Sequence, residues 1–215
     1  MPATVDSLYE QLFPLTTVMK QRFVETFSGS VLDTDRWYVT NTNASVSGMS
    51  NEVDGGYYIT DTNSYDYTKV SFNDKRQYDG RASKFIYQAK LSNAGATNAS
   101  GGGLFNLNSD FDLTTSSGYQ WEQSANTNYL MCGDGSARSW GTTSGISAGY
   151  HTYSAEASLT SVVGSIDGVE VLTRTSNPPQ NLPPTSGTGN KLQPMFWHKG
   201  TSETFNINYF EAYNT

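Results

Sequence analysis

Hydrophobic and polar residues alternate with a period of two along many short segments of the chain from Phe23 onward. In Lys84–Leu91, apolar side chains alternate with Lys and Gln, with Ile86 as the exception. Clusters of Gly, Asn, Asp and Ser separate such segments, and this pattern predicts an all-β sandwich or barrel. The predicted strands are Gly56–Thr60, Lys84–Leu91, Gly103–Asn108, Tyr119–Ser124, Asn128–Cys132, Tyr150–Leu159, Val162–Ile166, Gly168–Thr173, Leu192–His198 and Phe205–Tyr213.

Two local signals complete the pattern. Asp167-Gly168 lies between two apolar runs and predicts a tight β-hairpin. Near the N-terminus, Leu8, Leu12 and Phe13 form one apolar stripe, and Pro14 ends the short helix that this spacing predicts. We expect residues 1–22 to form a helical arm and residues 23–215 to form one domain. The arm either covers one end of that domain or docks on a partner through its apolar stripe.

Composition narrows the function classes. The chain has 215 residues, a formal net charge of −7 and only 15% charged residues, so a basic surface for nucleic acid is not expected. Its single cysteine, Cys132, excludes an intrachain disulfide and a cysteine metal cluster. The N-terminal sequence shows no signal peptide, and no apolar run is long enough to predict a membrane span.

Three segments in order are similar to the concanavalin A-like lectin/glucanase superfamily, which includes laminin G-like modules and family 16 glycoside hydrolases. The first is Phe23–Val39, where Leu32, Asp33 and Trp37 match an LD-x-x-x-W pattern. The second is Gly149–Val171, and its matching residues are His151, Tyr153, Glu156, Asp167 and Gly168. The third is the closing segment Phe205–Tyr213, FNINYFEAY.

The resemblance implies an all-β, two-sheet antiparallel jelly-roll β-sandwich with one concave sheet. It also implies that Trp37 is a core residue and that the closing segment pairs with the first strand. Many domains of this superfamily hold one structural Ca²⁺, for which Glu25, Asp33 and Asp35 are the candidate oxygen donors here. No other cofactor is expected.

The catalytic motif of the family 16 hydrolases, E-x-D-x-x-E on one strand, has no counterpart in this sequence. The sole E-x-D is Glu52-Val53-Asp54, and no second Glu follows it at the required spacing. We expect the catalytic strand at Gly101–Asn108, which contains no carboxylate, and the sequence therefore predicts a protein that is not an enzyme. The alternative is a rearranged pair, Glu122 and Glu156, facing each other across the concave sheet.

Aromatic and amide side chains suggest a glycan-binding surface. Tyr119, Trp121 and Gln123 alternate onto one face of a single predicted strand. Trp140 lies in a polar, glycine-rich segment, where an aromatic side chain often marks a binding surface. Tyr129 and Trp197 complete the candidates, and the alternative for each is a place in the core.

These observations favour a non-catalytic, surface-displayed structural or adhesion protein, such as a virion decoration or fibre-type subunit of a phage or virus. We expect a homo-oligomer or larger assembly held by the N-terminal arm, a location on a virion surface or outside the cell, and a cell-surface glycan as a possible ligand. Two alternatives stay open: a carbohydrate-binding module, and a glycoside hydrolase or polysaccharide lyase with rearranged catalytic residues.

Overall fold

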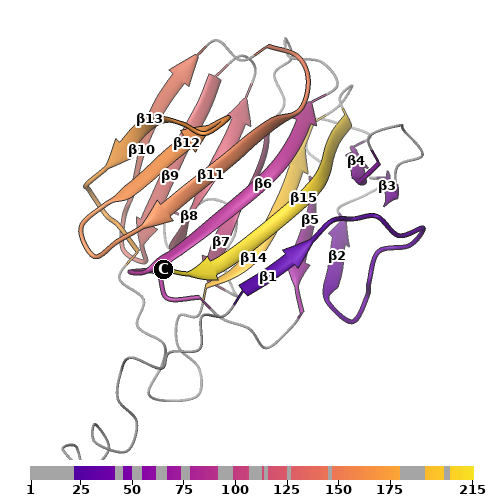
Figure 1. Ribbon diagram of the computed structural model, residues 1–215, viewed down its shortest axis with the longest axis horizontal. Helices are drawn as coiled ribbons and strands as arrows, with labels where there is room; N and C mark the ends of the chain where they lie inside the picture. The colour runs from indigo at the N-terminus through magenta and orange to yellow at the C-terminus, as the bar shows by residue number, and fades with distance from the viewer. Residues whose placement is uncertain are drawn as a thin grey trace, which may run out of the picture.

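The computed structural model describes residues 22–41, 46–49, 55–61, 67–73, 78–91, 99–106, 113, 116–124, 127–144, 147–179, 192–200 and 204–215. These ranges form strands, turns and short connections (Figure 1). Within them, no helix has the length and apolarity that crossing a bilayer requires. The predicted arm, with Leu8, Leu12 and Phe13, lies outside the described residues.

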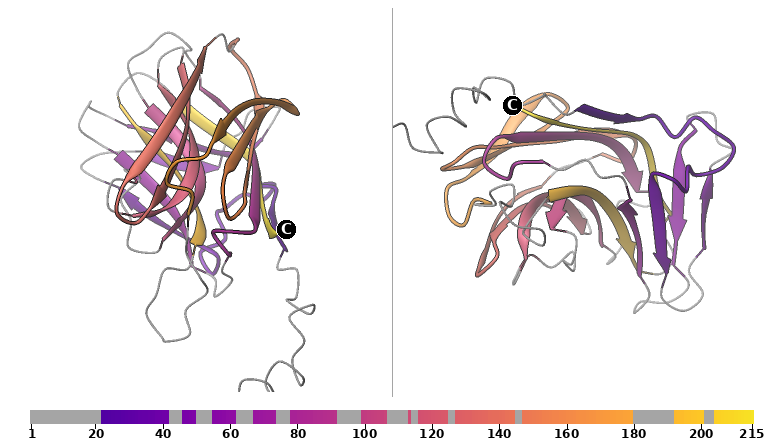
Figure 2. Two further views of the ribbon diagram at one scale, coloured as in Figure 1. Left: turned by 90° about the vertical axis from the view of Figure 1, so that its left-hand side faces the viewer. Right: turned by 90° about the horizontal axis from the view of Figure 1, so that it is seen from below.

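The strands form two antiparallel sheets of eight and seven strands. Sheet A has the order β13-β12-β11-β6-β15-β4-β3, with β1 also paired to β15. Sheet B has the order β10-β9-β8-β7-β14-β5-β2. Strands distant in sequence are neighbours in both sheets, which confirms the jelly-roll β-sandwich expected from the sequence. Figure 2 shows the two layers curving together, with the outer face of sheet B on the inside of the curve.

The bounds of the strands follow the alternating segments closely. Sheet A contains β1 (Arg22–Glu25), β3 (Val46–Met49), β4 (Tyr57–Thr60), β6 (Ser83–Leu91), β11 (His151–Ala157), β12 (Val162–Ile166), β13 (Val169–Arg174) and β15 (Thr204–Asn214). Sheet B contains β2 (Trp37–Asn41), β5 (Tyr67–Phe72), β7 (Ala99–Asn106), β8 (Ser117–Ser124), β9 (Thr127–Asp134), β10 (Arg138–Ser144) and β14 (Leu192–Lys199).

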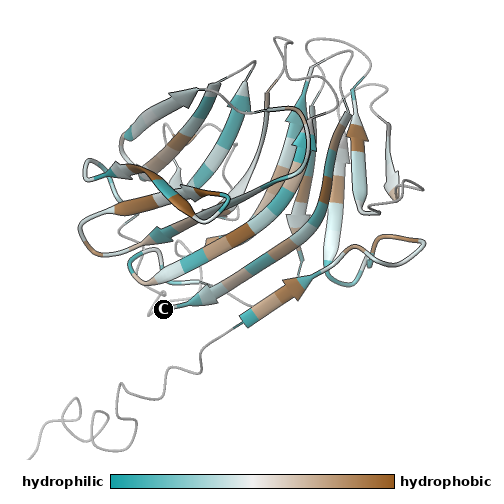
Figure 3. Ribbon diagram, turned by 45° about the horizontal axis from the view of Figure 1, so that its top comes forward, coloured by the Kyte–Doolittle hydropathy of each residue, from teal (hydrophilic) through white to brown (hydrophobic). Residues whose placement is uncertain are grey.

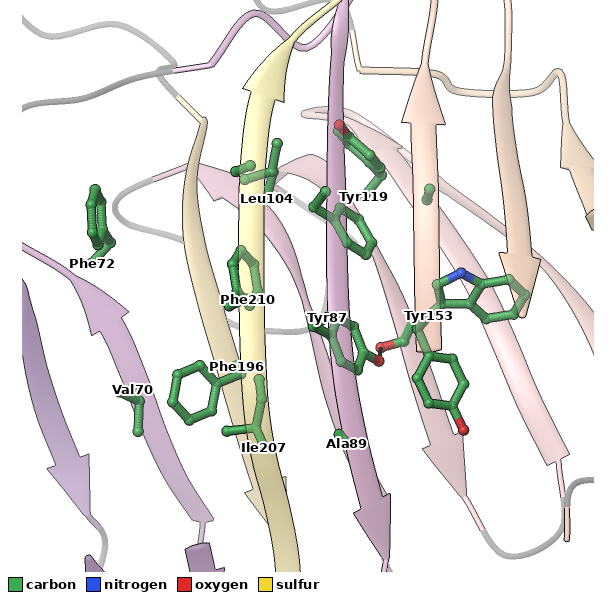
Figure 4. Packing of buried hydrophobic residues seen from close by; sticks show 14 of the residues in the cluster. Val70, Phe72, Tyr87, Ala89, Leu104, Tyr119, Tyr153, Phe196, Ile207 and Phe210 are labelled. Carbon is green, nitrogen blue, oxygen red and sulfur yellow. Dashed lines mark hydrogen bonds between the residues drawn. The ribbon is translucent and has the colours of Figure 1, made fainter. Parts of the chain in front are cut away.

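Hydrophobic and hydrophilic residues alternate along the strands (Figure 3), and aromatic side chains from both sheets fill the space between them (Figure 4). Trp37 is fully buried, and its ring packs edge-on against Phe72 and Phe196 at centroid distances of 5.2 and 5.3 Å. Tyr87 stacks on Tyr153 at 5.1 Å within sheet A. Such pairs add stability beyond the area that they bury, so this interior accounts for the cohesion of a chain with few charged residues.

Two further predictions from the sequence are confirmed. Asp167 and Gly168 adopt φ values of 51° and 80°, and they connect β12 to β13 in the predicted hairpin. A two-residue turn of this kind needs positive φ at both positions, which Asp and Gly tolerate. The closing strand β15 pairs antiparallel with β1, with Phe23 opposite Ala212.

Candidate functional site

Strand β8 presents different chemistry on its two faces. Tyr119 and Trp121 point into the sandwich and are both 0% exposed. The Trp121 indole donates to the Ser154 carbonyl at 2.8 Å, and the Tyr119 hydroxyl lies 2.9 Å from the Ser83 hydroxyl. Their predicted role as a glycan platform is therefore wrong, because both rings belong to the core.

Gln123 shares the inward face with these two aromatic residues and is also buried. It belongs to a row of buried polar residues that crosses sheet B in register, namely Asn128, Gln123, Ser100, His198 and Thr68. His198 Nδ1 lies 2.7 Å from the Ser100 hydroxyl within this row. The prediction that Gln123 meets a ligand at the surface is corrected by this inward position.

The outer face of β8 carries Gln120 and Glu122, because alternate residues of a strand point to opposite faces. Glu122 lies opposite Gly101 of β7 and opposite Tyr129 of β9. Extending this register gives a row across the outer face of sheet B, which we call the carboxylate row. It consists of Thr40, Lys69, Trp197, Gly101, Glu122, Tyr129 and Thr142.

Trp197 lies flat across β7 and holds Gln120 in place. Its indole donates to Gln120 Oε1 at 2.9 Å, which spans the width of β7 between β14 and β8. A Cβ on Gly101 would lie 3.0 Å from Trp197 Nε1 and 2.7 Å from the Trp121 carbonyl, so glycine is required there. Trp197 is on the outer face but only 1% exposed, and it acts as a support rather than as a platform.

A second row, parallel to the carboxylate row, carries the exposed aromatic residues at its two ends. This aromatic row consists of Tyr38, Ser71, Met195, Gly103, Gln120, Met131 and Trp140. Tyr38 is 43% exposed and Trp140 is 51% exposed. The Arg138 guanidinium lies 5.3 Å from the centre of the Trp140 ring. The predicted exposure of Trp140 is confirmed, although it lies on a strand and not in a loop.

Apolar side chains fill the spaces among these polar groups. Phe105, Met131, Met195 and Trp197 pack with Leu113 in a second hydrophobic cluster, and Tyr129 packs against it half-buried. Because Leu113 comes from the connection between β7 and β8, this connection reaches the outer face of sheet B. A pocket of about 30 Å³, room for a water molecule, lies beside the cluster between Tyr38, Lys69 and Gln193.

The pairing of Glu122 with Glu156 is wrong. Glu156 lies on β11 in sheet A and forms an ion pair with Lys84 at 3.4 Å. Trp121 and Ala155 face the core, so Glu122 and Glu156 point outward from opposite sides of the sandwich. Glu122 also acts electrostatically on the interior. Burial is the main cause that raises the pKa of Tyr87 well above its usual value, and electrostatic interactions with Tyr153 and then with Glu122 add to this increase.

The predicted calcium donors are engaged by other groups. Glu25 accepts hydrogen bonds from the amide of Phe27 at 2.9 Å and from the Trp37 indole at 3.3 Å. Asp33 forms an ion pair with Arg36 at 3.1 Å. Among the residues that the structure describes, no three acidic, His or Cys side chains gather as metal ligands would. The structural Ca²⁺ implied by the resemblance stays a prediction from the sequence.

His151 lies at the rim in a three-residue cluster with Ser147 and Asp167. Its Nδ1 is 2.7 Å from Asp167, and its Nε2 donates to the Ser147 carbonyl at 2.9 Å. The Ser147 hydroxyl lies farther away, at 3.3 Å. A base for a serine nucleophile must direct a free lone pair at the hydroxyl, so this cluster serves to hold the segment before β11 against the β12–β13 turn.

The sandwich resembles solved structures of carbohydrate-active enzymes. A family 16 glycoside hydrolase of Bacteroides ovatus, in complex with a mixed-linkage glucan product, has a TM-score of 0.63 and 12% identity over 87% of this chain and 98% of that one. A Bacillus licheniformis β-glucanase has a TM-score of 0.62 and 15% identity, covering 90% and 98%. The catalytic domain of a Thermotoga petrophila laminarinase has a TM-score of 0.59 and 14% identity, covering 91% and 98%.

No protein-family model matches the chain. No curated protein matches it significantly either. At these identities the likeness to solved structures shows the fold, which is the concanavalin A-like jelly roll of the family 16 glucanases.

These neighbours correct the expectation that the protein is not an enzyme, because the chain shares its fold with solved glycoside hydrolases. They lend no support to a virion decoration, capsid or adhesion role. The expectation of no enzymatic activity rested on finding no carboxylate in Gly101–Asn108. The adjacent strand β8, however, carries Glu122 on the outer face.

Gln120 was not among the residues predicted from the sequence, and Glu122 was predicted in the wrong pair. The alternation in Tyr119–Ser124 contained the necessary signal. Once Trp121 is assigned to the core, Gln120 and Glu122 must point to the opposite face. Trp197 and Tyr129 were candidates from the sequence. The structure places both in the carboxylate row, Tyr129 next to Glu122 and Trp197 two strands away from it.

Proposed function

We propose that the protein is a carbohydrate-active enzyme of the glycoside hydrolase type, which binds a glycan along the outer face of sheet B and acts on it with Glu122. The observation that carries this proposal is the position of Glu122 in the carboxylate row. It lies on the concave outer face of sheet B, in register with Gly101 of β7 on one side and with Tyr129 of β9 on the other.

The surroundings of Glu122 suit recognition of a sugar. Gln120 lies two residues away on the same face, and its orientation is fixed by the 2.9 Å bond from Trp197. Gln120 itself is fully buried and supports this face from beneath, while the half-buried ring of Tyr129 offers apolar surface to a sugar ring. The absence of side chains at Gly101 and Gly103 makes room on β7 for the Trp197 ring and for Gln120.

Hydrolysis of a glycosidic bond normally requires two carboxyl groups on either side of that bond. Glu122 is the one carboxylate on this face among the residues that the structure describes. Asp110 and Asp112, in the connection from β7 to β8, lie outside the described residues. The partner carboxyl group of Glu122 is to be identified by substitution, for which the sequence offers Asp110 and Asp112.

The test is release of reducing ends from laminarin and from mixed-linkage β-glucan, the two substrate classes named for the neighbours. Replacing Glu122 with Gln should lower the rate by about 10²–10⁴-fold, the usual contribution of a general acid or base. Asp110→Asn and Asp112→Asn identify the second carboxyl group. Glu156→Gln is the matched control, since its side chain is on the other sheet and its loss should leave the rate unchanged.

Full activity of Glu122→Gln would refute the assignment of this residue. Glycan binding without cleavage, lost in Tyr129→Ala, would instead support a carbohydrate-binding module. Assembly through residues 1–22 and a location outside the cell or on a virion stay predictions from the sequence.

A further inference from the structure

A groove with a volume of about 600 Å³ lies on the outer face of sheet A, the face turned away from Glu122. It is formed by four adjacent strands, β1, β15, β6 and β11, and by Thr215, which follows β15 (Figure 1). A volume of this size is typical of pockets that hold a bound group. The function proposed above makes no use of this groove.

The carboxylates of the groove already have partners. Glu211 is only 6% exposed, and its carboxylate accepts bonds of 2.6 Å from both the Arg22 guanidinium and the Tyr209 hydroxyl. Glu156 forms its ion pair with Lys84 at 3.4 Å. Since these two carboxylates are satisfied within sheet A, the surface that a partner would gain most by covering is apolar.

Apolar side chains lie in register across this part of sheet A. Val24 of β1 is opposite Glu211, and Glu211 is opposite Ile86 of β6. Val24 is 38% exposed, and Ile86 and Tyr213 are half-buried. The neighbours of Ile86 along β6 point into the core, so Ile86 itself points into the groove. Covering these side chains removes apolar surface from water and stabilises whatever covers them.

The segment before β1 has the sequence pattern of an amphipathic helix. Apolar residues follow the spacing i, i+3, i+4, i+7, i+8 of one helix face, namely Val5, Leu8, Tyr9, Leu12 and Phe13. The positions between them are polar, namely Asp6, Ser7, Glu10 and Gln11. A short helix of this kind is marginal in water and needs a surface on which its apolar face can pack.

Chain continuity and length relate this segment to the groove. Arg22, the first described residue, lines the groove, and residues 14–21 separate it from the apolar pattern. These residues span at most about 26–29 Å, which is enough to turn back over β1. A helix over residues 5–13 is about 14 Å long, and the three strand intervals from β1 to β11 also measure about 14 Å.

We propose that residues 1–21 dock in the groove on the outer face of sheet A of their own chain, with the apolar helix face over Val24, Ile86 and Tyr213. Because the segment is tethered at Arg22, its effective concentration at the groove is on the order of millimolar, which favours it over a free partner. The outer face of sheet B stays open in this arrangement. The inference is independent of the proposed function, whose residues lie on the other sheet.

Paired cysteines in the full chain test the position. Leu8→Cys and Leu12→Cys are each combined with Ile86→Cys, and the matched control combines each with Thr142→Cys, an exposed position on sheet B. The native Cys132 is buried and is kept in every variant. In a glutathione redox buffer, at least one Ile86 pair should form its disulfide within one chain with an effective concentration about tenfold or more above its control.

Substitutions with aspartate test the apolar contact. Leu12→Asp places a charge on the apolar face and should lower the melting temperature by about 3–8 °C. Gln11→Asp is the matched control, because it adds the same charge at a polar position and should change the melting temperature by at most about 1–2 °C. Thermal unfolding of both variants is followed by circular dichroism.

Three results would overturn the docking. Disulfide formation with Ile86 no stronger than with Thr142 shows that the segment is not held at the groove. Equal melting temperatures of the two aspartate variants show that the apolar face is not packed. A covalent dimer as the main product shows that the groove takes the segment of a second copy and not that of its own chain.

Discussion

The two faces of sheet B differ in what they contribute to the protein. The inner face carries fully buried rings, such as Trp121 and Phe196, which pack against sheet A and hold the sandwich together. The outer face carries a smaller apolar cluster, which includes Trp197, beside Gln120 and Glu122. Both faces are built from the same strands, so adjacent residues in the sequence serve stability and function in turn. Stability and function should therefore separate cleanly by mutation.

The largest effect is expected on the inner face. Trp121→Ala removes a ring that fills the space beside Tyr153 and Gly164, and it should lower the free energy of unfolding by about 3–5 kcal/mol. By contrast, Glu122→Gln on the neighbouring position should change it by less than about 0.5 kcal/mol. Urea denaturation of both variants measures the contrast. Similar losses in the two variants would show that the faces are not energetically distinct.

An intermediate effect is expected where the two roles meet, at Trp197. Trp197→Phe keeps most of the apolar contact but removes the donor to Gln120, leaving a buried amide oxygen without this bond. This should cost about 1–3 kcal/mol of stability. It should also lower glycan affinity, since Gln120 then loses its fixed orientation. Gln120→Leu tests the same bond from the other side, and unchanged stability in both variants would contradict the supporting role.

The smallest effect is expected at the rim, far from either face of sheet B. Partial burial opposes ionisation of Asp167, but the Thr152 amide and His151 outweigh it and lower the pKa of this carboxyl group. A lowered pKa in the folded state stabilises the protein above the unfolded-state pKa of about 4, and this stabilisation is lost as the pH falls below that value.

Asp167→Asn should therefore lower the melting temperature at pH 6, by the equivalent of about 1 kcal/mol or less because the side chain is half exposed. The difference between the variant and the unmodified protein should shrink toward zero near pH 2, where both lack the charge. A difference that stays constant with pH would show that the turn geometry, and not the charge, is what the substitution changes.

The sequence by itself determined the elements and their alternation. Period-two segments predicted an all-β sandwich or barrel, and the Asp167-Gly168 turn predicted the hairpin. The resemblance to a known superfamily implied the sandwich and the buried position of Trp37, and the structure confirms all of these. The sequence also showed that Tyr119, Trp121 and Gln123 share one face of a strand. These properties are local, since they follow from backbone geometry and from neighbours along the chain.

Only the tertiary structure decided which of the two faces is the interior. A period of two separates odd from even positions but does not say which set is buried, and that choice depends on strands distant in sequence. For β8 the choice places Trp121 inside and Glu122 outside, and for β11 it places Glu156 on the opposite surface. The candidate site was therefore invisible as a motif, because its residues come from seven strands that meet only in the folded sheet.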